Sequence, residues 1–325
     1  MAASAEHVRA LVEAHAAGDD RGFYSVALQV AAREARQGHT RAAASLRDFI
    51  DAARRTRVRR LEPVGSPSSD GELAGILNHS HPEYGLDQMT LDPNVRAHLD
   101  RVLSEQRQRG KLADFGFSPV HRMLLTGPPG TGKSMSASAI AHELGLPLYT
   151  IRLDGLISRF MGETAAKLRT VFDAVGRTRA VYLFDEFDAL GAERIAGNDV
   201  GEARRILNSF LLFLDELDSH SLVIAATNHE TILDRALFRR FDLVVGYDRP
   251  SPSEAVEILR RRLSIMNTSR VPWTEVASGA IGLSHAELVA AAESAAKNAI
   301  LGGSDVIDSA ALDRALADRR AASDA

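Results

Sequence analysis

The sequence predicts an α/β fold built on a parallel β-sheet, and two observations support this class. Between residues 84 and 249 of the 325-residue chain, short apolar runs alternate with helical patterns. This alternation is typical of parallel strands that are buried on both faces and joined by helices. After "DRPSPSEA" the pattern is helical, which predicts a small helical domain over 250–325. The expected strands are "HRMLLT", "LPLYTIRL", "AVYLFD", "SLVIAAT" and "DLVVGY".

The first sixty residues predict a separate helical bundle. Apolar side chains recur there at spacings of three and four, and "GDD" and Gly38 are expected helix ends. The next stretch contains "EPVGSPSSDGE", whose Pro, Gly and Ser content is typical of a linker. The expected order is a bundle over 1–60, a linker over 61–83, an α/β domain over 84–249 and the helical domain over 250–325.

Composition excludes several classes of function. The chain has no cysteine, which excludes a disulfide framework and cysteine nucleophiles. Its net charge of −4 gives no general basic field for nucleic acid, and the basic run 54–60 lacks interleaved aromatic residues, so nucleic acid is not an expected partner. No window approaches the ~20 apolar residues of a membrane span. The first twenty residues carry charges where a signal peptide is apolar, so we expect a cytoplasmic protein.

A phosphate-binding loop follows the strand "HRMLLT". The pattern G-x-x-x-x-G-K-S lies between this strand and a predicted helix, as in the sheet of a P-loop NTPase. Glycines leave backbone N–H groups free to bind phosphate oxygens, the lysine supplies a positive charge, and the serine hydroxyl is a ligand for Mg²⁺. ATP and Mg²⁺ are therefore the expected cofactors. The expected nucleotide-binding residues of the loop are Gly127, Pro128, Pro129, Gly130, Thr131, Gly132, Lys133 and Ser134.

Two acidic residues and one asparagine follow neighbouring apolar strands. Asp185 and Glu186 come directly after "AVYLF", at the carboxyl end of a strand, where open α/β sheets bind ligands. We expect Asp185 to hold Mg²⁺, directly or through water, and Glu186 to act as the general base toward the attacking water. Asn228 follows "SLVIAAT", and it either orients this water or bonds the backbone of its own turn.

These motifs, in this order, resemble the AAA family of ATPases from residue 84 onward. "GPPGTGKS" and "LFDEFDAL" resemble the family's Walker A and B elements, "AATN" its sensor-1 strand, and "LDRALFRRFD" its second region of homology. The adjacent arginines before Phe241 and the single cassette behind a helical bundle are similar to katanin, spastin and the vacuolar-sorting AAA ATPase. The cassette is also similar to bacterial AAA ATPases that are paired with a subtilisin-like protease. The resemblance implies an ATP hydrolase that forms a homo-oligomeric ring, expected to be a hexamer.

The resemblance also implies roles for residues outside the phosphate loop. Arg239 and Arg240 would act on the ATP of a neighbouring subunit, and surface ion pairs are the alternative. Where many members of the family have "GFSGADL", this chain has "GLSHAEL". Ala286 matches the family, and His285 replaces a glycine near the adenine. We expect His285 either to contact the nucleotide or the subunit interface, or to cap its helix.

The segment "SRFMGET" lies at the position of the family's central pore loop. Phe160, Met161 and Gly162 match its aromatic, aliphatic and glycine positions, and the resemblance implies that they grip a polypeptide substrate. The alternative is that Phe160 packs under its own helix. A second pore loop is expected over 197–205.

Three functions therefore remain open. The leading one is remodelling, unfolding or disassembly of a protein through the pore, with a separate protease as one further partner. The others are an ATP-switched assembly or signalling scaffold and a nucleic-acid-loading ATPase. In "HELGL", residue 146 is Leu where the zinc-binding pattern H-E-x-x-H needs a second His, so this segment is not a metalloprotease helix.

Overall fold

The structure is a computed structural model. It describes residues 75–153, 163–189, 200–217, 220–229 and 235–323, and the single residues 9, 30 and 73. The chain separates into two compact units, Met1–Gly65 and Ser66–Ala325, and every element below belongs to the second unit. The predicted N-terminal bundle lies outside the described residues, apart from Arg9 and Val30.

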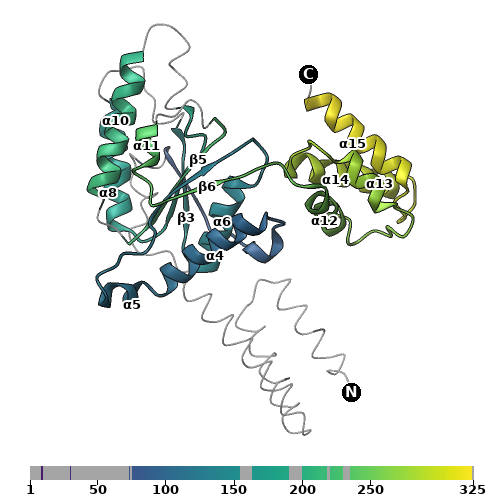
Figure 1. Cartoon of the computed structure of the whole chain (residues 1–325), viewed down its shortest axis with the longest axis horizontal. Coiled ribbons are helices and arrows are strands. Elements are labelled where there is room, and N and C mark those ends of the chain that lie inside the picture. The colour runs from purple at the N-terminus through teal and green to yellow at the C-terminus, as the bar shows by residue number, and fades with distance from the viewer. Residues whose placement is uncertain are drawn as a thin grey trace. The chain divides into compact units, whose positions relative to one another are not determined.

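A six-stranded sheet forms the centre of the α/β part (Figure 1). Its strand order is β1-β3-β4-β5-β2-β6, and all neighbouring pairs are parallel except β1 with β3. The five parallel strands are the five that the sequence predicts, so the α/β class is confirmed. The strands are β1 (Leu77–Ser80), β2 (Arg122–Thr126), β3 (Leu148–Ile151), β4 (Val181–Phe184), β5 (Leu222–Thr227) and β6 (Leu243–Gly246).

The edge strand β1 differs from the sequence prediction, which includes its residues in the linker. Its sequence "LNHS" has one apolar residue, Leu77, and this is the only buried residue of the strand. The strand forms because its backbone pairs antiparallel with β3, from Leu77 opposite Ile151 to Ser80 opposite Leu148. The linker prediction is therefore wrong over residues 77–80. A four-residue edge strand carries too short a pattern to be recognised from sequence.

Helices cover both faces of the sheet, so strand side chains alternate between two apolar clusters. In β4, Tyr182 and Phe184 belong to one cluster, whereas Val181 and Leu183 belong to the other, as the two-residue period of a strand requires. The first cluster contains residues of α8 (Glu163–Arg177) and α10 (Val200–Glu216), and the second contains residues of α4 (Pro93–Arg107) and α6 (Lys133–Leu144). The short helices of this part are η2 (Leu86–Gln88), α5 (Arg109–Asp114) and α11 (Arg235–Phe238).

The C-terminal helices have an apolar cluster of their own, which shares no residue with the clusters of the sheet. Capping boxes begin two of these helices, with Ser251 paired to Glu254 and Ser284 paired to Glu287. The helices are α12 (Pro252–Arg262), α13 (Trp273–Gly279), α14 (His285–Leu301) and α15 (Ser309–Ser323).

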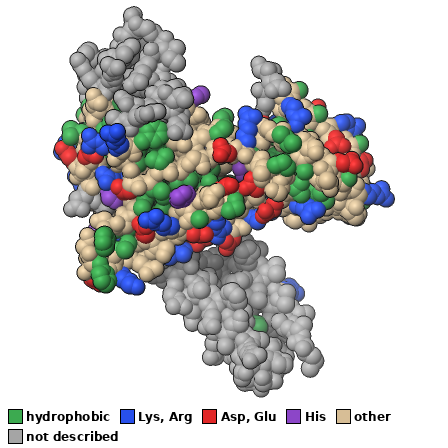
Figure 2. All heavy atoms as spheres, viewed as in Figure 1, with side chains coloured by type: hydrophobic (Ala, Val, Ile, Leu, Met, Phe, Trp, Pro, Cys, Tyr) green, Lys and Arg blue, Asp and Glu red, His purple; other side chains and the backbone are tan. Residues whose placement is uncertain are grey.

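The surface in Figure 2 carries basic and acidic side chains that are interspersed, and no single basic patch dominates the face shown. This distribution agrees with the net charge of −4. Among the residues whose structure is described, no helix combines the length and the apolar character that crossing a bilayer requires.

Candidate nucleotide site

The phosphate loop connects β2 to α6, and three of its glycines have positive φ angles. The values are 137° at Gly127, 73° at Gly130 and 98° at Gly132, in a region that residues with a side chain rarely adopt. Gly127 is also crowded, because an added Cβ would lie 2.0 Å from the carbonyl oxygen of Tyr247. The backbone path of the loop therefore requires glycine at this position.

Replacing Gly127 with Ala is expected to lower the free energy of unfolding by about 2–6 kcal/mol, the combined cost of backbone strain and overpacking. The same change should remove ATP binding, because the loop has to move away from Tyr247. Urea denaturation and nucleotide binding measure the two effects. Gly110→Ala is the matched control, since Gly110 lies in α5 and an added Cβ there meets nothing within 4 Å. If both variants were as stable as the parent chain, the crowding argument would be wrong.

Lys133 begins α6 and points into the phosphate loop. Its ammonium donates hydrogen bonds to the carbonyl oxygens of Gly127 and Pro128, each at 2.7 Å. Burial lowers the pKa of Lys133 from its ordinary value, while the carboxylates of Asp185 and Asp188 act in the opposite direction. A partly buried cation and the first turn of a helix thus lie together, which is the arrangement that binds phosphate groups.

Ser134 and Asp185 meet at the carboxyl edge of the sheet. The Ser134 hydroxyl donates a hydrogen bond of 2.6 Å to Asp185 Oδ2, although the two residues are 51 positions apart in the chain. A hydroxyl and a carboxylate are oxygen ligands of the kind that Mg²⁺ takes alongside substrate phosphates. The two side chains therefore fit the predicted Mg²⁺ site. Bound Mg²⁺ would neutralise charge on the phosphate oxygens.

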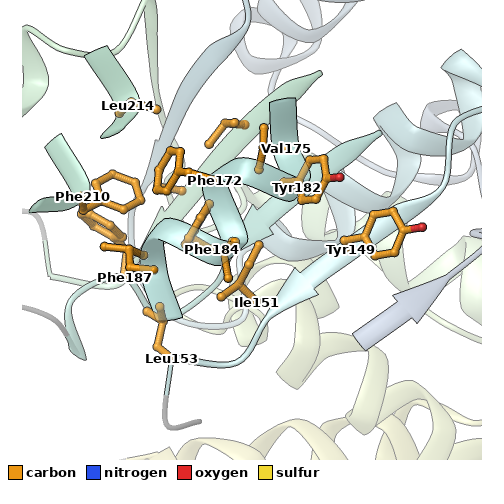
Figure 3. Packing of buried hydrophobic residues seen from close by; sticks show 14 of the residues in the cluster. Tyr149, Ile151, Leu153, Phe172, Val175, Tyr182, Phe184, Phe187, Phe210 and Leu214 are labelled. Atoms are coloured by element: carbon orange, nitrogen blue, oxygen red, sulfur yellow. The ribbon is translucent and has the colours of Figure 1, made fainter. Parts of the chain in front are cut away.

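Glu186 has a left-handed backbone conformation directly after β4. Its φ of 51° is the one positive value at a non-glycine position among the described residues. The turn is fixed on its far side, where Phe187 donates its N–H to the carbonyl oxygen of Ala226 at 2.8 Å and its ring packs 4.7 Å from that of Phe210 (Figure 3). Such a conformation costs about 1–3 kcal/mol and persists where its surroundings enforce it. The Glu186 side chain is exposed at the edge of the sheet that carries Asp185.

Asp188 joins this turn to the end of β5, and the sequence prediction does not include it. Its Oδ1 accepts hydrogen bonds from the Thr227 hydroxyl at 3.1 Å and from the Asn228 N–H at 3.2 Å. The turn after β5 is therefore bonded by Asp188, which weakens the alternative that the Asn228 side chain serves its own turn. Asp188 is the third acid of "DEFD", but this position alone does not identify partners that lie 39 and 40 positions further along the chain.

The first turn of α14 contacts the phosphate loop. The Ala286 N–H donates to the carbonyl oxygen of Gly130 at 3.1 Å, and a Cβ on Gly130 would lie 2.7 Å from Ser284 Oγ. Ser284 caps α14, since its hydroxyl accepts from the Glu287 N–H. The alternative that His285 caps this helix is therefore wrong. The contact with Gly130 brings the turn that carries His285 to the predicted nucleotide site.

The His285 ring is largely buried near the backbone of Thr90. Neither ring nitrogen is satisfied by a hydrogen bond of normal geometry among the described residues, and the buried hydroxyl of Thr90 is also unsatisfied. Burial lowers the pKa of His285, and the Glu254 carboxylate acts in the opposite direction. A neutral imidazole offers one donor and one acceptor, which are the groups that contact a nucleobase.

Arg239 and Arg240 lie in the turn after α11. The Arg240 guanidinium pairs with Asp215 of α10, and Arg239 is exposed. Within the described residues, no hydrogen bond or ion pair joins either arginine to the phosphate loop or to Asp185. The structure thus brings Lys133, Ser134 and Asp185 together and leaves the two arginines outside this group.

The two predicted pore loops are described only in part. Phe160, Met161 and Gly162 lie outside the described residues. In the second predicted loop, residues 200–205 form the first turns of α10, so the loop prediction is wrong there. The physical reason is that Ile206, Leu207 and the residues after them extend an apolar face at helical spacing.

The parallel sheet, the phosphate loop and the acidic pair at the strand ends together define a P-loop ATPase. Residues 123–249 match the family described as "ATPase family associated with various cellular activities (AAA)". The "Uncharacterized AAA family ATPase y4kL" of Sinorhizobium fredii is 38% identical over 237 residues, which are 72% of this chain and 71% of that protein. The chain belongs to the AAA family and is an ATP hydrolase.

Other relatives are named "ATP-dependent zinc metalloprotease FtsH". The protein of Pirellula staleyi is 36% identical over 220 residues, which are 62% of this chain and 30% of that protein. The protein of Helicobacter felis is 31% identical over 228 residues, which are 67% of this chain and 36% of that protein. The chain spans about a third of the length of these two metalloproteases.

Proposed function

We propose that this ATPase forms a ring of identical subunits, expected to be a hexamer, that hydrolyses Mg-ATP at subunit interfaces. The energy remodels, unfolds or disassembles a protein drawn through the central pore. The observation that best supports hydrolysis is the hydrogen bond between Ser134 and Asp185, because it brings the two proposed Mg²⁺ ligands together near Lys133 and Glu186.

Each residue of the site would have a separate role in ATP hydrolysis. The loop backbone and Lys133 would bind the phosphates, and Ser134 and Asp185 would hold Mg²⁺. Glu186 would accept a proton from the attacking water, which Asn228 would orient. His285 and Ala286 would lie along the base of the nucleotide, an arrangement supported by the contact of α14 with the phosphate loop and by the unsatisfied ring nitrogens.

The position of the two arginines supports the proposal of a ring. Charge spreads over the phosphoryl oxygens in the transition state, and an additional guanidinium stabilises it. Because neither arginine bonds the site of its own chain among the described residues, we assign them to the site of a neighbour. A head-to-tail interface of this kind closes into a ring when its rotation permits closure.

A protease belongs among the partners to be tested. The support for this partner is that two relatives carry the name of an ATP-dependent zinc metalloprotease. Nucleic acid is not proposed as a partner, since the net charge is negative and the face in Figure 2 has no dominant basic patch.

Phe160→Ala, with Phe160→Tyr as the matched variant, tests threading through the pore. The concentration of an unstructured polypeptide such as casein that half-maximally stimulates ATP turnover should rise roughly 30-fold for Phe160→Ala, which corresponds to the ~2 kcal/mol of an aromatic hot spot. Phe160→Tyr should stay close to the parent chain, because its ring offers the same flat surface. Equal stimulation of all three proteins would contradict threading and favour the ATP-switched scaffold.

A further inference from the structure

We propose that the two adjacent arginines have different roles: Arg239 contacts the phosphates of a neighbouring subunit's ATP, and Arg240 positions the turn through its ion pair with Asp215. This inference rests on the proposed function. It states which of the two arginines contacts the neighbour's phosphates and which one positions the turn. It departs from the equal roles that the sequence resemblance implies for the two residues.

The turn that carries the arginines is fixed by burial on both sides. Leu237 is 1% exposed and Phe241 is 7% exposed, and both belong to the apolar cluster that includes α8 and α10. The Arg240 N–H donates to the carbonyl oxygen of Leu237 at 3.0 Å. Because the backbone is held in this way, side-chain contacts decide where each guanidinium lies.

Asp242 ties the same turn to β2, the strand that leads into the phosphate loop. Its carboxylate accepts hydrogen bonds from the N–H groups of His121 and Arg122, at 3.1 Å and 3.0 Å, and from the Arg122 guanidinium at 2.8 Å. Burial alone would raise the pKa of Asp242, but the bonds from Arg122 and His121 outweigh burial and lower it. The Asp242 carboxylate is therefore ionised at neutral pH and keeps its hydrogen bonds to His121 and Arg122.

Arg240 is directed back onto its own subunit. Its guanidinium pairs with Asp215 in the last turn of α10, a helix held in the same cluster by Phe210 and Leu214 (Figure 3). The side chain of Arg240 is 49% exposed and that of Asp215 is 31% exposed, so the pair adds at most ~1 kcal/mol to stability. Its effect is positional, because it fixes the turn against a rigid helix.

Arg239 differs from Arg240 in this respect. It is exposed, and within the part of the chain that the structure describes it forms no ion pair or hydrogen bond. Its guanidinium has five N–H donors in a planar array that matches phosphate oxygens. Arg240 would have to leave Asp215 before it reached a phosphate, whereas Arg239 is exposed and would break no hydrogen bond or ion pair to the described residues.

Four variants of the full chain separate the two roles in assays of ATP turnover. Arg239→Ala should lose about 10³-fold or more in kcat. Arg240→Ala and Asp215→Asn should each lose up to about 5-fold in kcat, with KM for ATP unchanged, because a contact worth ~1 kcal/mol shifts the population of the correctly placed turn by no more than this. The double variant of Arg240 and Asp215 should lose no more than either single variant.

Glu293→Gln is the matched control. It removes the pair of Glu293 with Arg262 in the C-terminal helices, another exposed arginine–carboxylate contact whose side chains are 33% and 52% exposed. Turnover of this variant should equal that of the parent chain. Thermal melting of every variant then separates loss of folding from loss of positioning.

A charge exchange gives the decisive result. The double variant Asp215→Arg, Arg240→Asp restores the pair with its charges reversed, so it should recover most of the turnover that Arg240→Ala loses. If Arg240 itself contacts phosphate, the exchange stays as inactive as Arg239→Ala, and this overturns the division of roles. Parental turnover of Asp215→Asn, which keeps the shape of the side chain, overturns it as well and does not depend on how the exchange folds.

The outcomes also separate this inference from the proposed function. Equal large losses for Arg239→Ala and Arg240→Ala, with no effect of Asp215→Asn, would overturn the division of roles and leave hydrolysis at interfaces intact. Parental turnover of both arginine variants would overturn hydrolysis at interfaces itself.

Discussion

Glu186→Gln is expected to lower kcat for ATP by about 10²–10⁴-fold, the usual contribution of a general base. Glutamine has the same shape and exposure but does not accept a proton, so the attacking water is no longer activated. ATP binding should persist, because the contacts of Lys133 within the phosphate loop and the Ser134–Asp185 bond do not involve Glu186. The variant should therefore accumulate in its ATP-bound form.

Steady-state kinetics and equilibrium binding of ATP, both on the full chain, measure the two parts of this prediction. Glu275→Gln is the control, since Glu275 is exposed in the first turn of α13 and makes no part of the nucleotide site. Turnover of Glu186→Gln at the parental rate would remove Glu186 from the role of base. Loss of ATP binding would instead assign Glu186 to the binding of Mg²⁺ or phosphate.

Arg239→Ala is expected to lower turnover by about 10³–10⁵-fold, the range known for an arginine that stabilises the transferring phosphoryl group. If the arginine acts on a neighbour, the variant keeps an intact site of its own and lacks only what the adjoining subunit should supply. A Glu186→Gln subunit has the opposite defect, because it still carries Arg239. A mixture of the two should therefore hydrolyse ATP faster than the sum of the separate proteins.

Titration of one variant into the other at fixed total concentration measures this recovery. In the control mixture, the Glu186→Gln subunit also carries Arg239→Ala, so no subunit can supply Arg239 to its neighbour. Turnover that stays additive in the first mixture would show that the arginine serves its own chain, and the ring proposal would fail with it.

The four inner parallel strands were predictable because they are almost wholly buried and so carry continuous apolar runs, whereas in the edge strand β6 only Val245 is buried. All four residues of β4 and all six of β5 are buried. The edge strand β1 has no such run, since only Leu77 is buried, and its position depends on pairing with β3. In so short a strand, pairing through the backbone does not require a recognisable pattern of side chains.

The phosphate loop and the acidic pair were predictable because their chemistry depends on neighbours in sequence. Asp188 and Asp215 were not, because the partners that give them a role lie 39 and 25 positions away along the chain. His285 is an intermediate case. Its place at the start of a helix suggests a cap, but Ser284 satisfies the helix end, and the imidazole nitrogens are buried without a hydrogen bond of normal geometry to the described residues.

The phosphate loop contacts both the residue that follows β6 and the start of α14. Gly127 lies against the carbonyl group of Tyr247, only five residues before α12 begins, and Gly130 accepts the N–H of Ala286 at the start of α14. A shift of the phosphate loop would therefore act directly on the start of α14 and on the residues that lead from β6 into α12.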